Sequence, residues 1–170
     1  MPLTHSTVLK NTTGQMLACL GAILKKGAAH AESLKTPDAV FLDFRLYPDM
    51  FPLSRQVQIA CDNACRGAAR LAGVQLPSFP DTEASFAQLI ERTQKANAYV
   101  QGVSSDAIDG REGETITFPV GGGREMSMSA QNFLLGFILP NVYFHAATAY
   151  DILRHNGAPL GKSDFLRPPA

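Results

Sequence analysis

The sequence contains only three cysteines, Cys19, Cys61 and Cys65. So small and odd a number does not build a disulfide framework, and it is typical of a protein kept in a reducing compartment. Cys61 and Cys65 share one helix face, but no second Cys or His pair lies near them in the sequence. We therefore interpret them as small buried apolar residues and expect a cytoplasmic protein.

The chain also lacks an excess of charge and a long apolar run. Fifteen Lys and Arg residues balance fifteen Asp and Glu residues, so no bulk positive field attracts nucleic acid or an anionic membrane surface. Nowhere do about 18 apolar residues follow one another, and the first residues show no secretion signal. We expect no nucleic-acid partner and no membrane partner.

The composition is that of an ordinary globular protein, with 45% hydrophobic and 18% charged residues in a chain of 170. At this length about 70% of the unfolded surface can be buried. We find no internal repeat and no low-complexity tract. The expectation is a single domain over residues 1–170 that folds without a partner.

Apolar residues recur at helical spacing in four segments separated by proline and glycine signals. We expect helices over residues 4–34, 52–73, 81–102 and 129–156, with Asp81 or Thr82 capping the third. The alternating segment 115–128 around a triple glycine predicts a small β-hairpin between helices three and four. The predicted fold class is all-α, a four-helix bundle.

Two places should depart from regular helix. Pro140 lies inside the fourth expected helix, where it removes a backbone hydrogen bond and predicts a kink. Residues 45–53 contain a dense Pro-Asp-Met-Phe-Pro signature. We expect Met50 and Phe51 to be buried against the bundle, and Asp49 to meet the start of the second helix.

The fourth expected helix carries polar residues on its apolar face. Asn141 and His145 are four residues apart and share the face of Phe137, so we expect them to point into the bundle beside Gln56 of the second helix. A core histidine is either hydrogen-bonded to a neighbouring helix or part of a metal site. The candidate pocket residues are Gln56, Asn141, His145, Asp49 and Tyr150, and His145 is the candidate metal ligand.

Two stretches of sequence resemble a known family. They are Arg45–Leu53 with Gln56-Val57, and Leu139–His145 continuing through Ala149–Gly157 to Gly161–Leu166. They resemble an uncharacterised bacterial and fungal family of unknown function within the DinB-like (DinB/YfiT-like) superfamily. The resemblance covers nearly the whole chain and is specific for the family, but for no activity.

This resemblance implies an up-down-down-up bundle with a pocket between helices. Metal-binding members of the superfamily hold a divalent ion there through three histidines, one on helix two and an H-x-x-x-H pair on helix four. Here the pair falls on Asn141 and His145, and no histidine lies between Pro52 and Leu71. The resemblance therefore implies a degenerate metal site, and we favour no cofactor over a zinc or nickel ion.

Two hypotheses of function remain open. The first is a small-molecule-binding or structural module, expected to be a homodimer, with its pocket near Asn141 and His145. The second is a metal-dependent, thiol-linked transferase or hydrolase of the DinB/YfiT type, in which the ion lowers the pKa of a thiol or water. The count of metal ligands favours the first, and the sequence leaves open whether the chain is an enzyme.

Overall fold

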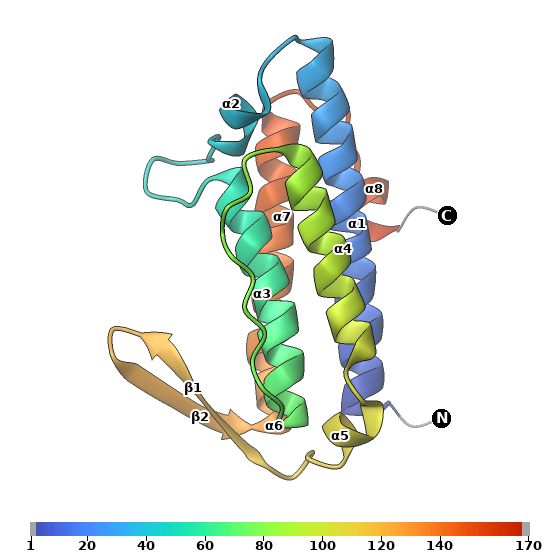
Figure 1. The fold of residues 1–170 in the computed structure, drawn as a ribbon, viewed down its shortest axis with the longest axis vertical. Helices are drawn as coiled ribbons and strands as arrows, with labels where there is room; N and C mark the ends of the chain where they lie inside the picture. Colours follow the sequence, from blue (N-terminus) through green and yellow to red (C-terminus); the bar gives the residue numbers. More distant parts are fainter. Residues whose placement is uncertain (1–2, 168–170) are drawn as a thin grey trace.

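The fold was analysed in a computed structural model, which describes residues 3–167 (Figure 1). Residues 1–2 and 168–170 of the expected domain lie outside this part. The elements in chain order are α1 (His5–Ser33), α2 (Asp38–Leu42), α3 (Leu53–Ala72), α4 (Phe86–Gly102), α5 (Ser105–Asp109), β1 (Thr115–Gly121), β2 (Arg124–Ser129), α6 (Ala130–Asn132), the π-helical turn η1 (Phe133–Ile138), α7 (Leu139–His155) and α8 (Lys162–Leu166).

Four long helices form an up-down-down-up bundle (Figure 1). α1 rises from the N-terminal end, α3 and α4 both run in the opposite direction, and the continuous run from α6 through α7 rises again. α4 packs against α1 and α3, and α7 packs against α3 and α1. The all-α class, the helix order and the hairpin before the fourth long helix are confirmed.

Local sequence signals explain several helix ends. Thr4 caps α1 by accepting a hydrogen bond from the amide of Thr7, and Ser129 caps the start of the fourth long helix by accepting from Asn132. Gly73 ends α3 with φ of 68°, a left-handed conformation that glycine adopts without strain. These caps depend on neighbouring residues alone, which is why they could be predicted.

The hairpin of β1 and β2 packs one of its faces on the bundle. Gly122 and Gly123 form its tip with φ of 60° and 69°, the positive values that a tight hairpin turn requires. Ile116 and Phe118 are buried and alternate with exposed neighbours. The hairpin therefore sends Phe118 toward the helices.

The connection from α3 to α4 runs along the full length of the bundle (Figure 1). Because these two helices point in the same direction, residues 74–85 must return from the end of α3 to the start of α4. The 20 residues of α3 are about 30 Å long, and the connecting residues span at most about 40 Å. The connection must therefore be nearly extended, which Pro77 and Pro80 favour.

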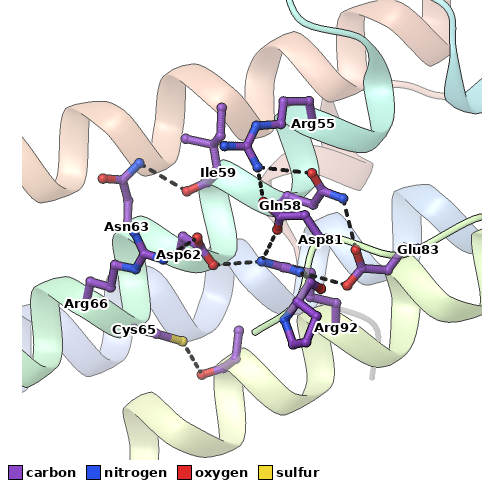
Figure 2. Close-up of polar contacts among 12 residues, drawn as sticks. Arg55, Gln58, Ile59, Asp62, Asn63, Cys65, Arg66, Asp81, Glu83 and Arg92 are labelled. Carbon is purple, nitrogen blue, oxygen red and sulfur yellow. Dashed lines mark hydrogen bonds and ion pairs between the residues drawn. The ribbon is translucent and has the colours of Figure 1, made fainter. Parts of the chain in front are cut away.

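Arg92 of α4 holds this connection against the helices (Figure 2). Its side chain is 2% exposed and donates to the carboxylate of Glu83 at 2.7 Å and to the carbonyl of Pro80 at 3.0 Å. The second amino group reaches Asp62 of α3 at 2.7 Å and Asp81 at 2.9 Å. Only Nε lacks a partner among the described residues. A buried guanidinium needs such pairing, and here the pairing joins α3, α4 and the connection.

The start of the third long helix differs from our expectation. Ser85 is its N-cap and accepts from the amide of Gln88, so the prediction of a cap at Asp81 or Thr82 is wrong. The carboxylate of Asp81 instead pairs with Arg55 and Arg92. Asp81 thereby stays in the extended connection, and the helix begins later.

The connection from α1 to α3 also differs. Its buried residues are Phe41 and Leu42 of the short helix α2, and the ring of Phe41 packs against that of Phe86 with centroids 6.2 Å apart. Phe51 is 54% exposed and Met50 is only half-buried. The prediction that both are buried is wrong, because α2 supplies the apolar contacts of this connection.

The irregularity expected near Pro140 is the π-helical turn η1, which ends two residues before it. The continuous helix Ala130–His155 is long and apolar enough to cross a membrane by length and composition alone. In this fold it is one member of the bundle and packs against α3 and α1, as core helices of soluble proteins do.

We expect Arg92→Ala to lower the free energy of unfolding by about 3 to 5 kcal/mol, since it removes the cation shared by Asp62 and Glu83, which are 15% and 12% exposed, and by the more exposed Asp81. Urea unfolding measures this change. Lys95→Ala is the matched control, because it removes an exposed pair with Glu91 that is just as short, and it should change stability by less than about 0.5 kcal/mol. Equal losses of stability in both variants would contradict a stabilising role for the buried ion pairs of Arg92.

Acid should weaken the same contact. Burial opposes ionisation of Glu83, but hydrogen bonds from Arg92 and Gln58 outweigh it, so its pKa lies below the ordinary value of 4.5. Glu83 therefore contributes stability that is complete above about pH 4.5 and is lost as the pH falls through its lowered pKa. Urea unfolding at a series of pH values should show a smaller decline in Arg92→Ala, and parallel declines would argue against this pairing.

Candidate functional site

A cleft of about 230 Å³ lies between α3 on one side and the hairpin and η1 on the other. The lining side chains are of two kinds, polar groups from α3 and apolar or aromatic groups that come mainly from β1 and η1. They are Arg55, Ile59, Asp62, Asn63, Arg66, Gly67, Arg70, Phe118, Pro119, Phe133, Phe137 and Ile138.

Three phenylalanines form the aromatic wall of the cleft. The ring centroid of Phe118 lies 4.7 Å from that of Phe133 and 4.5 Å from that of Phe137. Phe133 and Phe137 are stacked at 5.7 Å. Rings at these separations stabilise one another beyond their burial, so the hairpin and η1 form one rigid surface.

The opposite side of the cleft presents arginines held by carboxylates (Figure 2). Arg55 pairs with Asp81, and Arg66 pairs with Asp62 at 3.3 Å. Both carboxylates are shared with the buried Arg92. The ion pairs of Arg92 that fix the α3–α4 connection are therefore continuous with the charged side of the cleft.

His145 of α7 and Gln56 of α3, which are not among the residues that line this cleft, form a hydrogen-bonded pair. Nδ1 of His145 lies 2.7 Å from Oε1 of Gln56, and Nε2 of Gln56 donates to the carbonyl of Phe51 at 3.0 Å. Because an amide oxygen only accepts, Nδ1 carries the proton in this pair. Gln56 is 1% exposed and His145 is half-buried. The expected contact between the two residues is confirmed.

Burial, and after it the positive charge of Arg55, lower the pKa of His145 below 6.5. The imidazole is therefore neutral at pH 7. With Nδ1 donating to Gln56, Nε2 is left as a hydrogen-bond acceptor. Nε2 of His145 can thus accept a hydrogen bond from a donor group of a ligand, but the imidazole does not present a positive charge.

Asn141 does not join the pair. Its Nδ2 donates to the carbonyl of Phe137 in its own helix at 2.7 Å. Because Pro140 frees a backbone carbonyl one turn earlier, the sequence also predicts that His145 donates to a carbonyl near it. This prediction is wrong, since His145 donates to Gln56 and the Asn141 side chain donates to the carbonyl of Phe137.

Asp49 and Tyr150 lie apart from the Gln56–His145 pair. Asp49 is exposed, and α3 begins without a side-chain cap hydrogen bond. The ring of Tyr150 packs against Phe165 of α8 with centroids 6.0 Å apart. Of the five predicted pocket residues, the structure brings Gln56 and His145 into contact.

The phase of the fourth long helix explains these differences. The buried residues after η1 include Val142 and Ala149, whereas Asn141 and His145 are half-buried and Phe144 is 57% exposed. A π-helical turn contains more residues than an α-helical turn, so it rotates the face that follows it. A stripe extrapolated through η1 at ordinary helical spacing is consequently misplaced on α7.

The side chains around His145 do not fit a divalent metal. In the described range 3–167, no three His, Cys, Asp or Glu side chains lie close enough together to hold an ion. The residues nearest to the expected site offer amides, and Nδ1 of His145 is occupied by Gln56. A transition metal usually needs three strong ligands, so we derive no chemical step through a metal.

The cysteines are buried and free. Burial raises the pKa of Cys65 to about 12 and also raises that of Cys61, and the Cys65 thiol contacts the carbonyl of Ala96 at 3.6 Å. A buried thiol with a raised pKa is a poor nucleophile. The interpretation of Cys61 and Cys65 as small core residues is confirmed.

The sequence analysis missed the arginine cleft. In the sequence, the dipole at the end of the second expected helix is enough to account for Arg66 and Arg70. Their spacing from each other and from Arg55 places all three on one side of α3, and this signal could have been noticed. No sequence pattern shows that Phe118 of the hairpin lies opposite them.

The bundle order and the hairpin before the fourth long helix define the chain as an all-α bundle. The chain belongs to the family described as Domain of unknown function (DUF1993), which matches residues 7–166. A solved structure described as a DinB family member protein from Shewanella denitrificans is 38% identical to it, with a TM-score of 0.86, and the match covers 95% of this chain and 90% of that chain. No curated protein matches the chain.

We expect His145→Ala to lower the free energy of unfolding by about 1 to 3 kcal/mol, because the buried Oε1 of Gln56 loses its donor. The loss should be the same with chelator and with added zinc. It should narrow as the pH falls below about 6.5, because the lowered pKa of His145 makes its contribution complete only above that pH.

Urea unfolding of the wild type, His145→Ala and the exposed control His155→Ala checks this prediction. The control should change little under every condition. A stability gap that appears only with zinc would instead establish a metal site. The absence of any gap would show that the Gln56–His145 hydrogen bond does not stabilise the fold.

Proposed function

We propose that this protein is a small-molecule-binding module whose binding site is the cleft between α3, the hairpin and η1. The observation that carries the proposal is the pairing, within one cleft, of arginines on α3 with an aromatic wall opposite. Ligand sites typically combine an apolar wall with a few placed polar groups. At about 230 Å³, this cleft suits a small ligand.

Preorganisation supports the same proposal. Arg55 and Arg66 are already oriented by Asp81 and Asp62, and the three phenylalanines pack on one another. A ligand therefore has to immobilise few side chains, which lowers the entropic cost of binding.

We further propose a cytoplasmic location, which the free buried cysteines support, and a homodimer. Exposed aromatic side chains support association: Phe51, whose carbonyl accepts from Gln56, and Phe144, whose ring packs against His145. We expect light scattering to give the mass of two chains for the wild type and a lower mass for Phe144→Ser at the same concentration. A monomeric wild type would contradict the dimer.

A cleft-filling variant tests the binding function. Asn63 lines the cleft, is half-buried and bonds only the carbonyl of Ile59 in its own helix, so Asn63→Trp should fill the space with little other effect. We expect at least one class in a panel of neutral, cationic and anionic aromatic fragments to raise the Tm of the wild type. None should raise the Tm of the variant.

Gln94→Trp is the matched control. Gln94 is an exposed residue of α4 that lines a separate groove between α4 and α1, so the variant adds the same side chain away from the cleft. It should respond to the fragments as the wild type does. If no fragment stabilises the wild type, or if Asn63→Trp responds equally, the cleft is not a binding site.

A further inference from the structure

We propose that the cleft takes a small monocarboxylate with a flat apolar body, and that Arg70 together with Arg66 seats its carboxylate. This inference rests on the proposed binding function and adds the chemical class of the ligand. Three observations carry it: the charge balance of the network, the environment of Arg70, and the shape of the wall opposite.

The charged network around the cleft carries more positive than negative groups. Its members are Arg55, Arg66, Arg70, Arg92, Asp62, Asp81 and Glu83. Each carboxylate already pairs with at least one guanidinium, and Asp62 and Asp81 each pair with two. Asp62 is the one acidic residue among those that line the cleft. One positive charge therefore remains uncompensated in this network of four guanidinium groups and three carboxylates.

The uncompensated charge lies on Arg70. No hydrogen bond or ion pair joins its side chain to another residue of the described range 3–167, although the residue is half-buried and lines the cleft. Burial, followed by the charge of Arg66, lowers its pKa. A partly desolvated cation beside a like charge is unfavourable, and an anion bound between the two guanidinium groups would relieve it.

The C-terminus of α3 does not account for Arg70. A cation near a helix end can interact with the helix dipole, but Arg111 already lies over this end. Its guanidinium atoms are 2.6 Å from the place where a Cβ on Gly73 would be, and it pairs with Glu114. Arg70 instead belongs to the residues that line the cleft.

The cleft also limits the size and shape of the ligand. Its volume of about 230 Å³ is roughly that of eight water molecules in the liquid. Gly67 contributes no side chain to the floor, and Ile138 fills the space above its backbone. The side of the cleft where Phe133 and Phe137 stack on each other is aromatic, and it suits an aromatic ligand body. One uncompensated charge matches a monoanion rather than a dianion.

Three probes with the same ring system test the headgroup. Naphthalene-1-acetate is a monoanion, naphthalene-1-acetamide is its neutral counterpart, and 1-naphthyl phosphate carries more negative charge. By titration calorimetry at low salt, we expect the acetate to bind at least about tenfold more tightly than the acetamide and more tightly than the phosphate. Added salt should weaken acetate binding more than acetamide binding.

Variants of Arg70 test whether its guanidinium binds the carboxylate of the ligand. Arg70→Gln should remove most of the preference for the acetate over the acetamide, and Arg70→Lys, which keeps the charge, should retain part of it. Arg154→Gln is the matched control, because it makes the same charge change at the exposed end of α7. It should keep the full preference.

The results that overturn this inference differ from those that overturn the binding function. Equal binding of acetate and acetamide, tighter binding of the phosphate, a preference that survives Arg70→Gln, or no binding of any naphthalene probe each overturns the monocarboxylate. The binding function still stands in those cases if other fragments stabilise the wild type and Asn63→Trp abolishes their effect.

Discussion

The ionic contacts of Arg92 are the constraint on which this arrangement of helices depends. Two neighbouring helices that point in the same direction, α3 and α4, need a connection that returns along the whole bundle (Figure 1). An extended segment of this kind contributes few backbone hydrogen bonds of its own, so its polar groups need partners elsewhere. Arg92 provides them by pairing with Asp81 and Glu83 of the connection and with Asp62 of α3. The up-down-down-up order and the burial of Arg92 therefore explain each other.

The same contacts organise the cleft. Asp62 and Asp81 accept from the buried Arg92 on one side and from Arg66 and Arg55 on the other (Figure 2). A device that stabilises the fold thereby also orients the charged groups of the candidate binding site. Asp62 and Asp81 each pair with two guanidinium groups. An anion that approaches the cleft therefore does not have to displace either carboxylate from the buried Arg92.

The Gln56–His145 pair links two helices of the bundle through one hydrogen bond. It joins α3 to α7, as a shared ion would join helices that each supply a ligand. The neutral imidazole uses one nitrogen as a donor to Gln56 and keeps the other as an acceptor. The contact thus holds the two helices together and leaves one imidazole nitrogen for a further hydrogen bond.

The sequence by itself determined the features that depend on neighbouring residues. These are the four long helices, the caps at Thr4 and Ser129, the left-handed Gly73 and the tight turn of the hairpin. The contact between Gln56 and His145 was also expected from the sequence. Only the tertiary structure decided the features that join distant segments, because residues far apart in the chain leave no periodic signal. They are the rotation of α7 after the π-helical turn, the exposure of Phe51, the partners of Arg92, and the position of Phe118 opposite the arginines of α3.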